Sequence, residues 1–274
     1  MSSKIPVISI QGEPESYSYK TVVKRFGKSF VLRYRRTFRE TFNDVKNGES
    51  DYALLPFINF ITNEIPENYT LLDEFQLSIH EAITTKLDHA LLGKPGLTPE
   101  TVKYIYSHQQ ALAQCSEFLG LEQFKEVLVK EVHDTAGAKL YLEQNPEFSG
   151  IIASKSSAKA LGLEVIAHPI QNDKRNKTTF FLLSQKPLKP AEEDRFAVFG
   201  IKTPVEGDAL MMFAVKDKSV TVVRIYPEEL PYHVAKTYFL VKFIGDLADR
   251  KGLYALMKRE KLFTYMSGLF GGSL

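Results

Sequence analysis

Cysteine is nearly absent from this sequence: Cys115 is the only one among 274 residues. A single cysteine excludes an intramolecular disulfide and a zinc site built from several thiolates, and it is typical of a reducing compartment. Long apolar runs are also lacking, since none approaches the about 18 residues that a membrane-spanning helix needs. The N-terminal residues have no apolar core of the signal-peptide kind. We therefore expect a cytoplasmic protein with no membrane partner.

An excess of charge of one sign is lacking as well. The chain carries 35 basic and 33 acidic residues, a formal net charge of +2. This balance gives no ground to expect a nucleic-acid partner, and any site for an anion must be local. Hydrophobic residues make up 44% and charged residues 25% of the chain, as in ordinary globular proteins. Its length exceeds the usual size of one domain, so we expect one large or two smaller domains.

A unit of strand, polar loop and helix recurs along the chain. Apolar runs predict strands at residues 7–10, 51–55, 75–83, 89–92, 102–106, 127–132 and 150–154. Helices are predicted at residues 18–26, 37–47, 111–119 and 155–161, with a further short helix capped by Thr98. We expect the strand at 51–55 to stop at Pro56 and a polar loop to follow over 57–68. Such units predict an α/β domain with a mostly parallel sheet covered by helices.

Residues 170–184 (IQNDKRNKTTFFLLS) form the stretch with the clearest chemical character. Cations precede Thr178 and Thr179, which lead into an apolar run short enough to be a buried strand. Hydroxyls held at the mouth of a buried strand, next to Lys174, Arg175 and Lys177, would bind an anion and give it a proton. The alternative is a solvated polar loop that leads into a core strand, which is the commoner origin of such a pattern.

Two other polar segments have both a functional and a structural interpretation. His108 follows the strand predicted at 102–106 and is either a catalytic base or a helix cap. The cap is the commoner role, because no nucleophile, base and orienting group can be assembled from its sequence neighbours. The cations at residues 33–36 either line a cleft or form a solvated edge, and solvated edges are the commoner of the two.

The composition changes after Ser184. Residues 185–195 (QKPLKPAEEDR) hold two prolines and alternating charges with almost no apolar content, which is typical of a linker. Beyond them, the sequence predicts a small α+β module with strands at 196–201, 219–225 and 237–244 and a helix at 245–258. The glycine-rich tail at 267–274 is expected to be frayed.

Four segments are similar to the motifs of one enzyme family, the prephenate dehydratases. Residues 107–115 read SHQQALAQC, similar to the family's SHPQALAQC, and residues 176–180 fall on its N-x-T-R-F signature. Residues 134–138 (DTAGA) and 151–154 (IIAS) match two further segments. The resemblance spans nearly the whole chain. It implies a two-lobed α/β dehydratase domain, like a type II periplasmic binding protein, at 1–185, a linker at 186–195 and a small α+β ACT-like domain for regulation or dimerisation at 196–274.

The resemblance also implies an activity. Prephenate dehydratases convert prephenate to phenylpyruvate in phenylalanine biosynthesis, and the gain of aromaticity drives the loss of carbon dioxide and water. The protein has to orient the substrate and protonate its departing hydroxyl, so we expect no metal and no other cofactor. By the resemblance, Thr178 and Asn59 are the catalytic residues. The residues expected to bind the substrate are Ser16, Ser107, His108, Thr135, Arg175, Lys177 and Thr179.

The sequence departs from the family's motifs at the expected site. Thr179 replaces the arginine that holds a substrate carboxylate, and a threonine does not supply its charge. The family's P-I-E-N-S reads PFINF at residues 56–60, and its G-P-E-G-T-F-S reads GEPESYS at residues 12–18. We expect Thr179→Arg to raise dehydratase activity. Three interpretations stay open: a dehydratase that uses Lys177 or Arg175 instead, a non-catalytic or repurposed relative that binds a small carboxylate, and an enzyme for another chorismate-derived acid.

The C-terminal segment departs from the family as well. In the family, phenylalanine binds the ACT domain at a subunit interface and inhibits the enzyme, so the resemblance implies a homodimer or homotetramer. Here Asp208 interrupts the family's G-A-L, and RIYP at residues 224–227 replaces its E-S-R-P. We therefore expect that phenylalanine, the effector that the resemblance implies, does not bind. The matching regulatory positions are Gly207, Ala209, Leu210, Arg224 and Tyr226.

Overall fold

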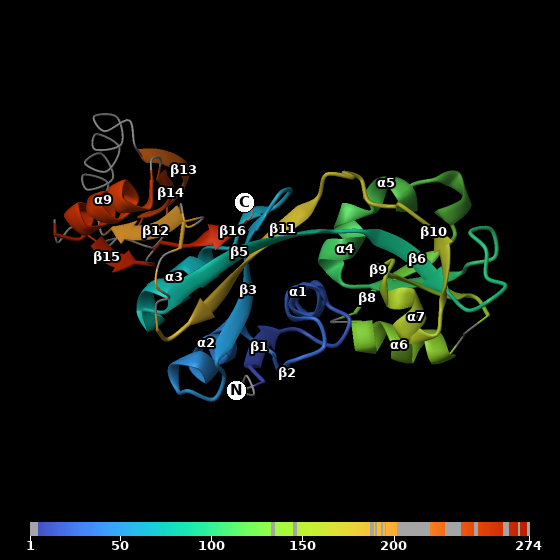
Figure 1. Cartoon of the computed structure of the whole chain (residues 1–274). Coiled ribbons are helices and arrows are strands. Elements are labelled where there is room, and N and C mark those ends of the chain that lie inside the picture. Colours follow the sequence, from blue (N-terminus) through green and yellow to red (C-terminus); the bar gives the residue numbers. More distant parts are fainter. Residues whose placement is uncertain are drawn as a thin grey trace. The chain divides into compact units, whose positions relative to one another are not determined.

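The computed structural model describes residues 5–132, 135–144, 147–186, 189, 191–192, 194, 196–201, 220–227, 237–243, 246–259, 263–267 and 269–272. The chain forms two compact units (Figure 1). Unit 1 comprises residues 1–11, 28–84 and 179–274, and unit 2 comprises residues 12–27 and 85–178. The chain therefore passes from one unit to the other four times. Two α/β lobes with a small α+β module confirm the predicted fold class.

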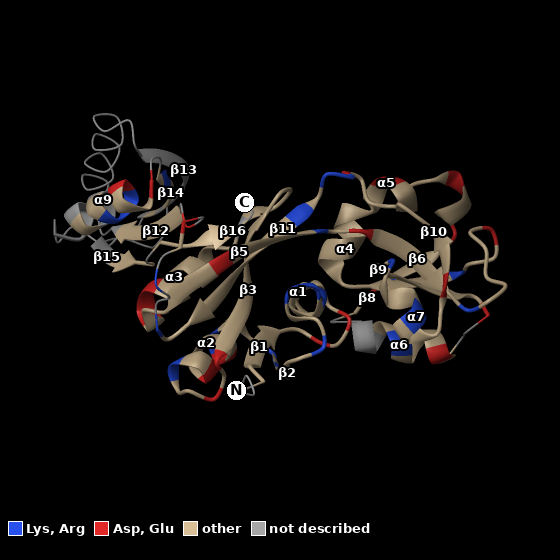
Figure 2. Ribbon diagram, in the orientation of Figure 1, with Lys and Arg blue, Asp and Glu red and all other residues tan. Residues whose placement is uncertain are grey.

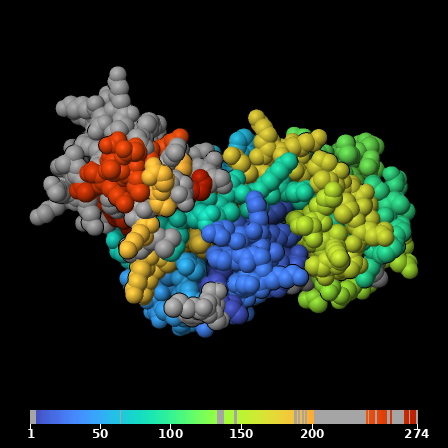
Figure 3. Space-filling view, in the orientation of Figure 1, coloured from blue at the N-terminus to red at the C-terminus, as the bar shows by residue number. Residues whose placement is uncertain are grey.

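A mixed sheet forms the centre of unit 1. Its strands follow the order β16-β5-β11-β3-β1-β2, and β4 pairs with β3. β1 pairs in parallel with β2 and β3, whereas β4 runs antiparallel to β3. β2 lies at the sheet edge, and Figure 3 shows blue N-terminal residues exposed on the face that it draws. The strands are β1 Val7–Gln11, β2 Val31–Arg35, β3 Tyr52–Asn59, β4 Asn63–Glu64, β5 Ser78–Lys86, β11 Lys177–Ser184 and β16 Gly271–Gly272.

Two helices contribute to the core of unit 1, namely α2 (Phe38–Lys46) and α3 (Pro66–Phe75). Thr37 starts α2 with a capping box, which satisfies backbone N–H groups that the first helical turn leaves without partners. Phe42 of α2 packs against Phe75 of α3 with ring centroids 5.5 Å apart. Both side chains belong to one cluster with the apolar residues of β3 and β11, so helices and sheet share a core.

The C-terminal part of unit 1 forms a separate antiparallel sheet in the order β13-β14-β12-β15. Its elements are β12 Phe196–Ile201, β13 Val220–Pro227, β14 Thr237–Phe243, α9 Leu247–Arg259 and β15 Phe263–Met266. The module contacts α3 and the residues after it: Tyr238 donates to Asp73 at 3.4 Å, and Tyr265 donates to the Leu77 carbonyl at 2.5 Å. The α+β module predicted from the sequence is therefore present and packs on the rest of unit 1.

The tail is part of the fold, so the prediction of a frayed segment at 267–274 is wrong for its described residues. Phe270 is fully buried and packs against Phe181 with ring centroids 5.4 Å apart. The two glycines of β16 pair in parallel with β5. At Gly272 φ is 114°, and a Cβ there would lie 2.0 Å from the Ala82 carbonyl oxygen. The glycine that suggested mobility is thus required for close pairing.

Unit 2 is built on a second mixed sheet, in the order β10-β6-β9-β7-β8. β7 pairs in parallel with β8 and β9, while β6 runs antiparallel to β9 and β10. Both large sheets contain antiparallel as well as parallel pairs, so the prediction of a mostly parallel sheet holds only in part. The strands are β6 His89–Gly93, β7 Tyr104–Ser107, β8 Leu128–Glu131, β9 Ser149–Ser154 and β10 Glu164–Ala167.

Unit 2 contains five α-helices among its described residues. They are α1 Tyr17–Phe26, α4 Gln109–Gln114, α5 Ser116–Leu119, α6 Thr135–Gln144 and α7 Ser157–Leu161, with a 3-10 turn, η1, at Glu122–Phe124. No helix in the described ranges is long and apolar enough to cross a membrane.

Two local predictions fail for identifiable reasons. The first concerns β3, which continues through Pro56. A proline has no amide hydrogen to donate, but the pairing of β3 with β1 ends at Leu54, so none is needed at Pro56 for that pairing. The Pro56 carbonyl accepts from the Asn68 side chain at 2.7 Å, which helps to fix α3 where a loop was predicted. The short helix predicted at Thr98 is a turn.

Candidate active site

Thr178 and Thr179 lie inside strand β11, which begins at Lys177. The sequence predicted hydroxyls at the mouth of a buried strand, and both threonines lie within the first three residues of that strand. Successive residues of a strand point to opposite faces, so the two hydroxyls have different surroundings. Thr178 is 6% exposed and Thr179 is 4% exposed.

The neighbouring strand β5 supplies a second pair of threonines. The Thr179 hydroxyl lies 2.8 Å from that of Thr84, and the backbone N–H of Leu87 donates to the carbonyl two residues before Thr178 at 2.9 Å. Both contacts fit one antiparallel register of these adjacent strands, and we infer from that register that Thr85 lies opposite Thr178. Thr178 and Thr85 thus share one face of the strand pair, and Thr179 and Thr84 share the other.

Helix α1 is hydrogen-bonded to the strand pair on the face that carries Thr85 and Thr178. Thr21 donates to the Tyr17 carbonyl at 2.7 Å, and its hydroxyl lies 2.8 Å from that of Thr85. Since Thr21 has only one hydroxyl hydrogen, Thr85 is the donor in that second bond. Thr85 can therefore offer Thr178 only a lone pair. The helix starts after Ser16, whose hydroxyl accepts from a backbone N–H of the first turn at 3.2 Å.

The cations before Thr178 appear in Figure 2 as blue segments at and before the start of β11. Lys174 and Arg175 are exposed. The Arg175 guanidinium binds Asp173 through Nε at 3.0 Å and Nη2 at 2.8 Å, and these bonds lower the pKa of Asp173 to about 2. Lys177 is half-buried, and strand alternation places it on the opposite face from Thr178.

Lys20 is a further cation, on α1, that the sequence patterns did not single out. Its ammonium donates to Oγ of Ser157, the first residue of α7, at 2.5 Å. The side chain is 15% exposed, and the Glu15 carboxylate is 4.0 Å away. Burial lowers the pKa of Lys20 to about 8, and nearby Glu15 and Asp88 offset this effect only in part. Lys20 is thus a partly buried cation whose charge is incompletely compensated.

A buried chain of hydrogen bonds links the first turn of α1 to β6. The Tyr17 hydroxyl accepts from the backbone N–H of Asp88 at 2.9 Å and lies 3.3 Å from Nδ1 of His89. Nε2 of His89 lies 2.9 Å from the side-chain oxygen of Gln114, so Nε2 carries the ring hydrogen and Nδ1 accepts from Tyr17. Burial lowers the pKa of His89 and raises the pKa of Tyr17, which keeps both groups neutral at pH 7.

Three other predicted site residues have structural partners. Asn59, in β3, accepts two backbone N–H bonds from the turn that follows it, both at 2.9 Å. Ser107 donates to a carbonyl of the neighbouring strand β9 at 2.7 Å. Nδ1 of His108 accepts from a backbone N–H at the start of α4 at 3.2 Å, so His108 is a helix cap. Asn59 and Thr179 belong to unit 1, and Ser107 and His108 belong to unit 2.

The remaining predicted residues lie in α6, in β13 or outside the described residues. Thr135 is the first residue of α6, and two of the regulatory positions, Arg224 and Tyr226, belong to β13. The other regulatory positions lie outside the described residues: Gly207, Ala209 and Leu210. Within the part of the chain that the structure describes, no group of three or more His, Cys, Asp or Glu side chains is placed to hold a metal ion.

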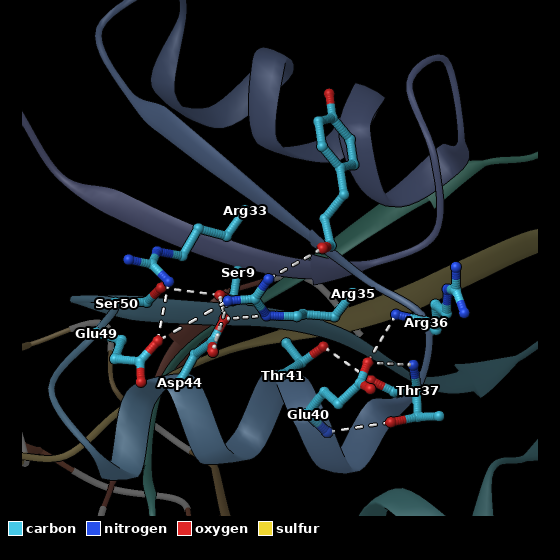
Figure 4. A network of polar contacts seen from close by, with 11 residues as sticks. Ser9, Arg33, Arg35, Arg36, Thr37, Glu40, Thr41, Asp44, Glu49 and Ser50 are labelled. Atoms are coloured by element: carbon cyan, nitrogen blue, oxygen red, sulfur yellow. Dashed lines mark hydrogen bonds and ion pairs between the residues drawn. The ribbon is translucent and has the colours of Figure 1, made fainter.

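The arginines of β2 form ion pairs within unit 1. Asp44 of α2 is 5% exposed and accepts from Arg35 through Nε at 2.8 Å and Nη2 at 3.0 Å. Ser9 of β1 also donates to Asp44, and Arg33 donates to Glu49 at 2.9 Å. Figure 4 shows these side chains meeting between the strands and α2. The network joins a helix to two strands, which is a structural role.

The sequence contains a signal for the residues that were missed. Tyr17, Lys20 and Thr21 have the i, i+3, i+4 spacing of one helix face. The segment ITTK at 83–86 holds the same threonine pair as KTTF at 177–180. Neither pattern shows that the two segments are partners, because the paired threonines are 95 residues apart.

Comparison with known proteins identifies relatives of the whole chain. The family described as "Prephenate dehydratase" matches residues 8–188. The Arabidopsis thaliana protein "Arogenate dehydratase/prephenate dehydratase 1, chloroplastic" is 30% identical over 277 residues, which cover 94% of this chain and 70% of that protein. A solved prephenate dehydratase from Arthrobacter aurescens, in complex with L-Phe, has a TM-score of 0.80 at 18% identity and covers 97% of this chain and 90% of its own.

A second solved structure, described as "GqqA- a novel type of quorum quenching acylases", has a TM-score of 0.77 at 24% identity and covers 97% of this chain and 98% of its own. At such identities the two structures show the fold, whereas the family match covers well over half of the sequence and includes Thr178. The chain belongs to the prephenate dehydratase family.

Proposed function

We propose that the protein is a prephenate dehydratase, which removes carbon dioxide and water from prephenate to give phenylpyruvate in L-phenylalanine biosynthesis. Prephenate is a dianion. The bond to its ring carboxylate breaks, the electron pair enters the ring, and the carboxylate leaves as carbon dioxide. The ring expels its hydroxyl, which leaves as water once it has a proton. One proton is taken up per turnover, because phenylpyruvate carries a single negative charge.

The setting of Thr178 is the observation that best supports this proposal. Its hydroxyl is buried in a strand, beside the half-buried Thr85, which is itself fastened to α1. Because Thr85 has given its hydrogen to Thr21, it does not compete with Thr178 as a donor to the substrate. We assign to Thr178 the hydrogen bond to the departing hydroxyl. A group in this role accelerates the reaction on the order of a hundred- to ten-thousand-fold.

Ser16 and Asn59 are proposed to position the substrate. The Ser16 oxygen accepts from α1, which leaves its O–H as the donor of that group. The Asn59 oxygen is held by two backbone N–H groups, which fixes the plane of its carboxamide and so the direction of its NH₂ group. Donors fixed in advance orient a substrate at a lower cost in entropy.

Two observations favour other candidate functions. The name of the Arabidopsis relative includes arogenate dehydratase, and arogenate carries an ammonium where prephenate has a keto group. Thr179, in place of the family's arginine, favours a repurposed relative that binds a small carboxylate. One neighbour of the same fold is described as an acylase, so the fold alone does not decide between these functions.

Incubation of the purified protein with prephenate, with arogenate and with neither tests these candidates. Phenylpyruvate is followed by its absorbance and phenylalanine by chromatography, against a control without protein. Formation of phenylpyruvate from prephenate well above the control supports the proposal. Turnover of arogenate alone identifies an arogenate dehydratase. Binding of phenylpyruvate without turnover of either substrate identifies the repurposed relative.

The C-terminal module is proposed to be an ACT-like domain that regulates the enzyme or joins its subunits. Its support is the succession of strands β12 to β15 with α9 before the last strand. A homodimer or homotetramer and a cytoplasmic location remain predictions from the sequence. Light scattering on the full chain measures the assembly state, and a monomer at micromolar concentration would contradict a role in joining subunits.

A further inference from the structure

We propose that Lys20 binds the side-chain carboxylate of the substrate and thereby selects the 2-oxo acid prephenate over the 2-amino acid arogenate. The inference rests on the proposed function and deepens it. Lys20 would supply the positive charge that the family's arginine provides, since this chain has Thr179 in place of that arginine. Arg175 is engaged by Asp173, and strand alternation places Lys177 on the face opposite Thr178.

The first step of the argument is position. Lys20 adjoins Thr21, which fastens α1 to the strand pair by its bond to Thr85, and Thr85 lies opposite Thr178. Tyr17, Lys20 and Thr21 have the spacing of one helix face, so Lys20 leaves α1 on the side that meets these strands. Its donation to Ser157 directs the ammonium toward the start of α7 within the same unit.

The second step is charge. The Lys20 side chain is 15% exposed, and its contact with Glu15 is at 4.0 Å, the outer limit of an ion pair. A partly buried cation with so little compensation gains from a second anion, because pairing offsets its lost hydration. Glu15 itself has φ of 67°, in the left-handed region that favours glycine, where the family motif quoted above has a glycine. We infer that Glu15 is the counter-ion of Lys20 when no substrate is bound.

The third step decides which carboxylate is bound. Pairing Lys20 with the ring carboxylate would stabilise the group that has to leave as neutral carbon dioxide, and so would oppose the reaction. The side-chain carboxylate persists in the product, so its pairing carries no such cost. Next to that carboxylate prephenate has a neutral keto oxygen, which Lys20 does not repel. Arogenate has an ammonium there, which Lys20 repels.

The charge of Lys20 also makes binding depend on pH. The titratable groups around it are Glu15 in the loop before α1, Asp88 before β6, His89 on β6, and Tyr17 on α1 itself. Burial outweighs the two carboxylates and lowers the pKa of Lys20 to about 8. Above that pH the free enzyme loses the cation, so the affinity for the carboxylate falls by about tenfold per pH unit.

The test compares wild type with Lys20→Met, Lys20→Arg and the control Lys24→Met, a change of an exposed lysine one turn further along α1. We expect Lys20→Met to raise KM for prephenate by about 10- to 100-fold with a much smaller change in kcat, and to reduce the preference over arogenate. Lys24→Met should change neither. KM of wild type should rise above pH 8, and that rise should vanish in Lys20→Arg, which stays protonated. An unchanged KM in Lys20→Met, or the same pH profile in Lys20→Arg, overturns the proposal.

A binding experiment separates failure of this inference from failure of the proposed function. If wild type turns over neither substrate, the proposed function fails, and calorimetric binding of phenylpyruvate tests Lys20 alone. Weaker binding by Lys20→Met than by Lys24→Met supports the role of Lys20. Equal binding, or no binding by wild type, overturns it.

A second variant keeps the test valid if Lys20→Met fails to fold. Glu15→Gly removes the resting counter-ion and relieves the positive φ. We expect it to bind phenylpyruvate more tightly than wild type does. Weaker or unchanged binding would contradict the pairing of Glu15 with Lys20.

Discussion

Thr85 lies opposite Thr178 across strands β5 and β11, and its hydroxyl donates to Thr21 of α1 at 2.8 Å. The contact joins three segments that are distant in the chain. It also sets the direction of the hydrogen bonds, because Thr21 passes its own hydrogen to the Tyr17 carbonyl. The surroundings of Thr178, to which the proposed mechanism assigns the proton donor, are therefore set by residues outside its own motif.

Thr178→Val tests that mechanism directly. The change removes one hydroxyl from a buried strand position while nearly preserving its shape, so we expect the fold to remain. kcat for prephenate should fall on the order of a hundred- to ten-thousand-fold, the value of a general acid. Steady-state kinetics and a melting curve measure both effects.

A matched control is Thr41→Val, which removes the hydroxyl of a fully buried threonine of α2 that is not among the proposed site residues. Its loss should cost about 1 kcal/mol of stability and leave kcat unchanged. Equal turnover by wild type and Thr178→Val would remove Thr178 from the mechanism.

The predictions from sequence that succeed concern local patterns. The helix predicted at 37–47 and the strand predicted from the apolar run after Thr178 are present in the structure within one or a few residues. The predictions that fail depend on partners distant in the chain. Pro56 stays in a strand because its neighbour β1 has already ended, and Gly272 is ordered because β5 lies against it.

The same distinction applies to the candidate site. The family motif identified Thr178. Its neighbour Thr85 follows only from the pairing of β5 with β11, and that pairing joins residues far apart in the chain: Thr84 and Thr179 are 95 residues apart. Lys20 was missed because its significance comes from burial, and an isolated lysine on a helix is ordinarily a solvated residue. Sequence reasoning therefore identified the proposed reactive group and not its surroundings.

Thr179→Arg has a different expected outcome once the structure is known. The sequence alone predicts a gain of activity, because the change restores the family's arginine. In the structure Thr179 is 4% exposed, bonds to Thr84 at 2.8 Å, and faces away from Thr178. An arginine there has to displace that bond and bury a charge, so we expect a lower melting temperature and no gain in kcat/KM. A variant that melts like wild type and turns over prephenate faster would show that the position still accepts the family's arginine.

Asp44→Asn tests the network of Figure 4. The change leaves the Arg35 guanidinium without the carboxylate that accepts two of its hydrogen bonds. Loss of one partner of a fully buried pair costs about 3–5 kcal/mol, and we expect about 1–3 kcal/mol here. The lower value follows because the Arg35 side chain is 30% exposed. Urea unfolding measures the cost, and Glu49→Gln, at an exposed ion pair, should cost less than about 1 kcal/mol. Similar costs for the two variants would mean that Asp44 is no more important than a surface charge.

The last prediction concerns regulation. A phenylalanine site has to pair both the ammonium and the carboxylate of its ligand, since leaving either buried without a partner costs several kcal/mol. The solved dehydratase from Arthrobacter aurescens was obtained in complex with L-Phe. Here Asp208 interrupts the first segment that the family uses, and Arg224, Ile225 and Tyr226 replace the polar order of the second.

We therefore expect that phenylalanine at about 1 mM neither raises the melting temperature of the full chain nor changes its assembly state. A ligand that binds the native state at a hundred times its Kd stabilises that state by about 2.7 kcal/mol, so binding in the micromolar range would be visible as a shift of several degrees. Phenylpyruvate serves as the positive control, because the proposed active site should bind it. Calorimetric binding of phenylalanine at micromolar affinity would overturn this prediction. It would also assign to Asp208 and Arg224 the pairing of the ligand's two charges, because these are the charged residues that the altered segments retain.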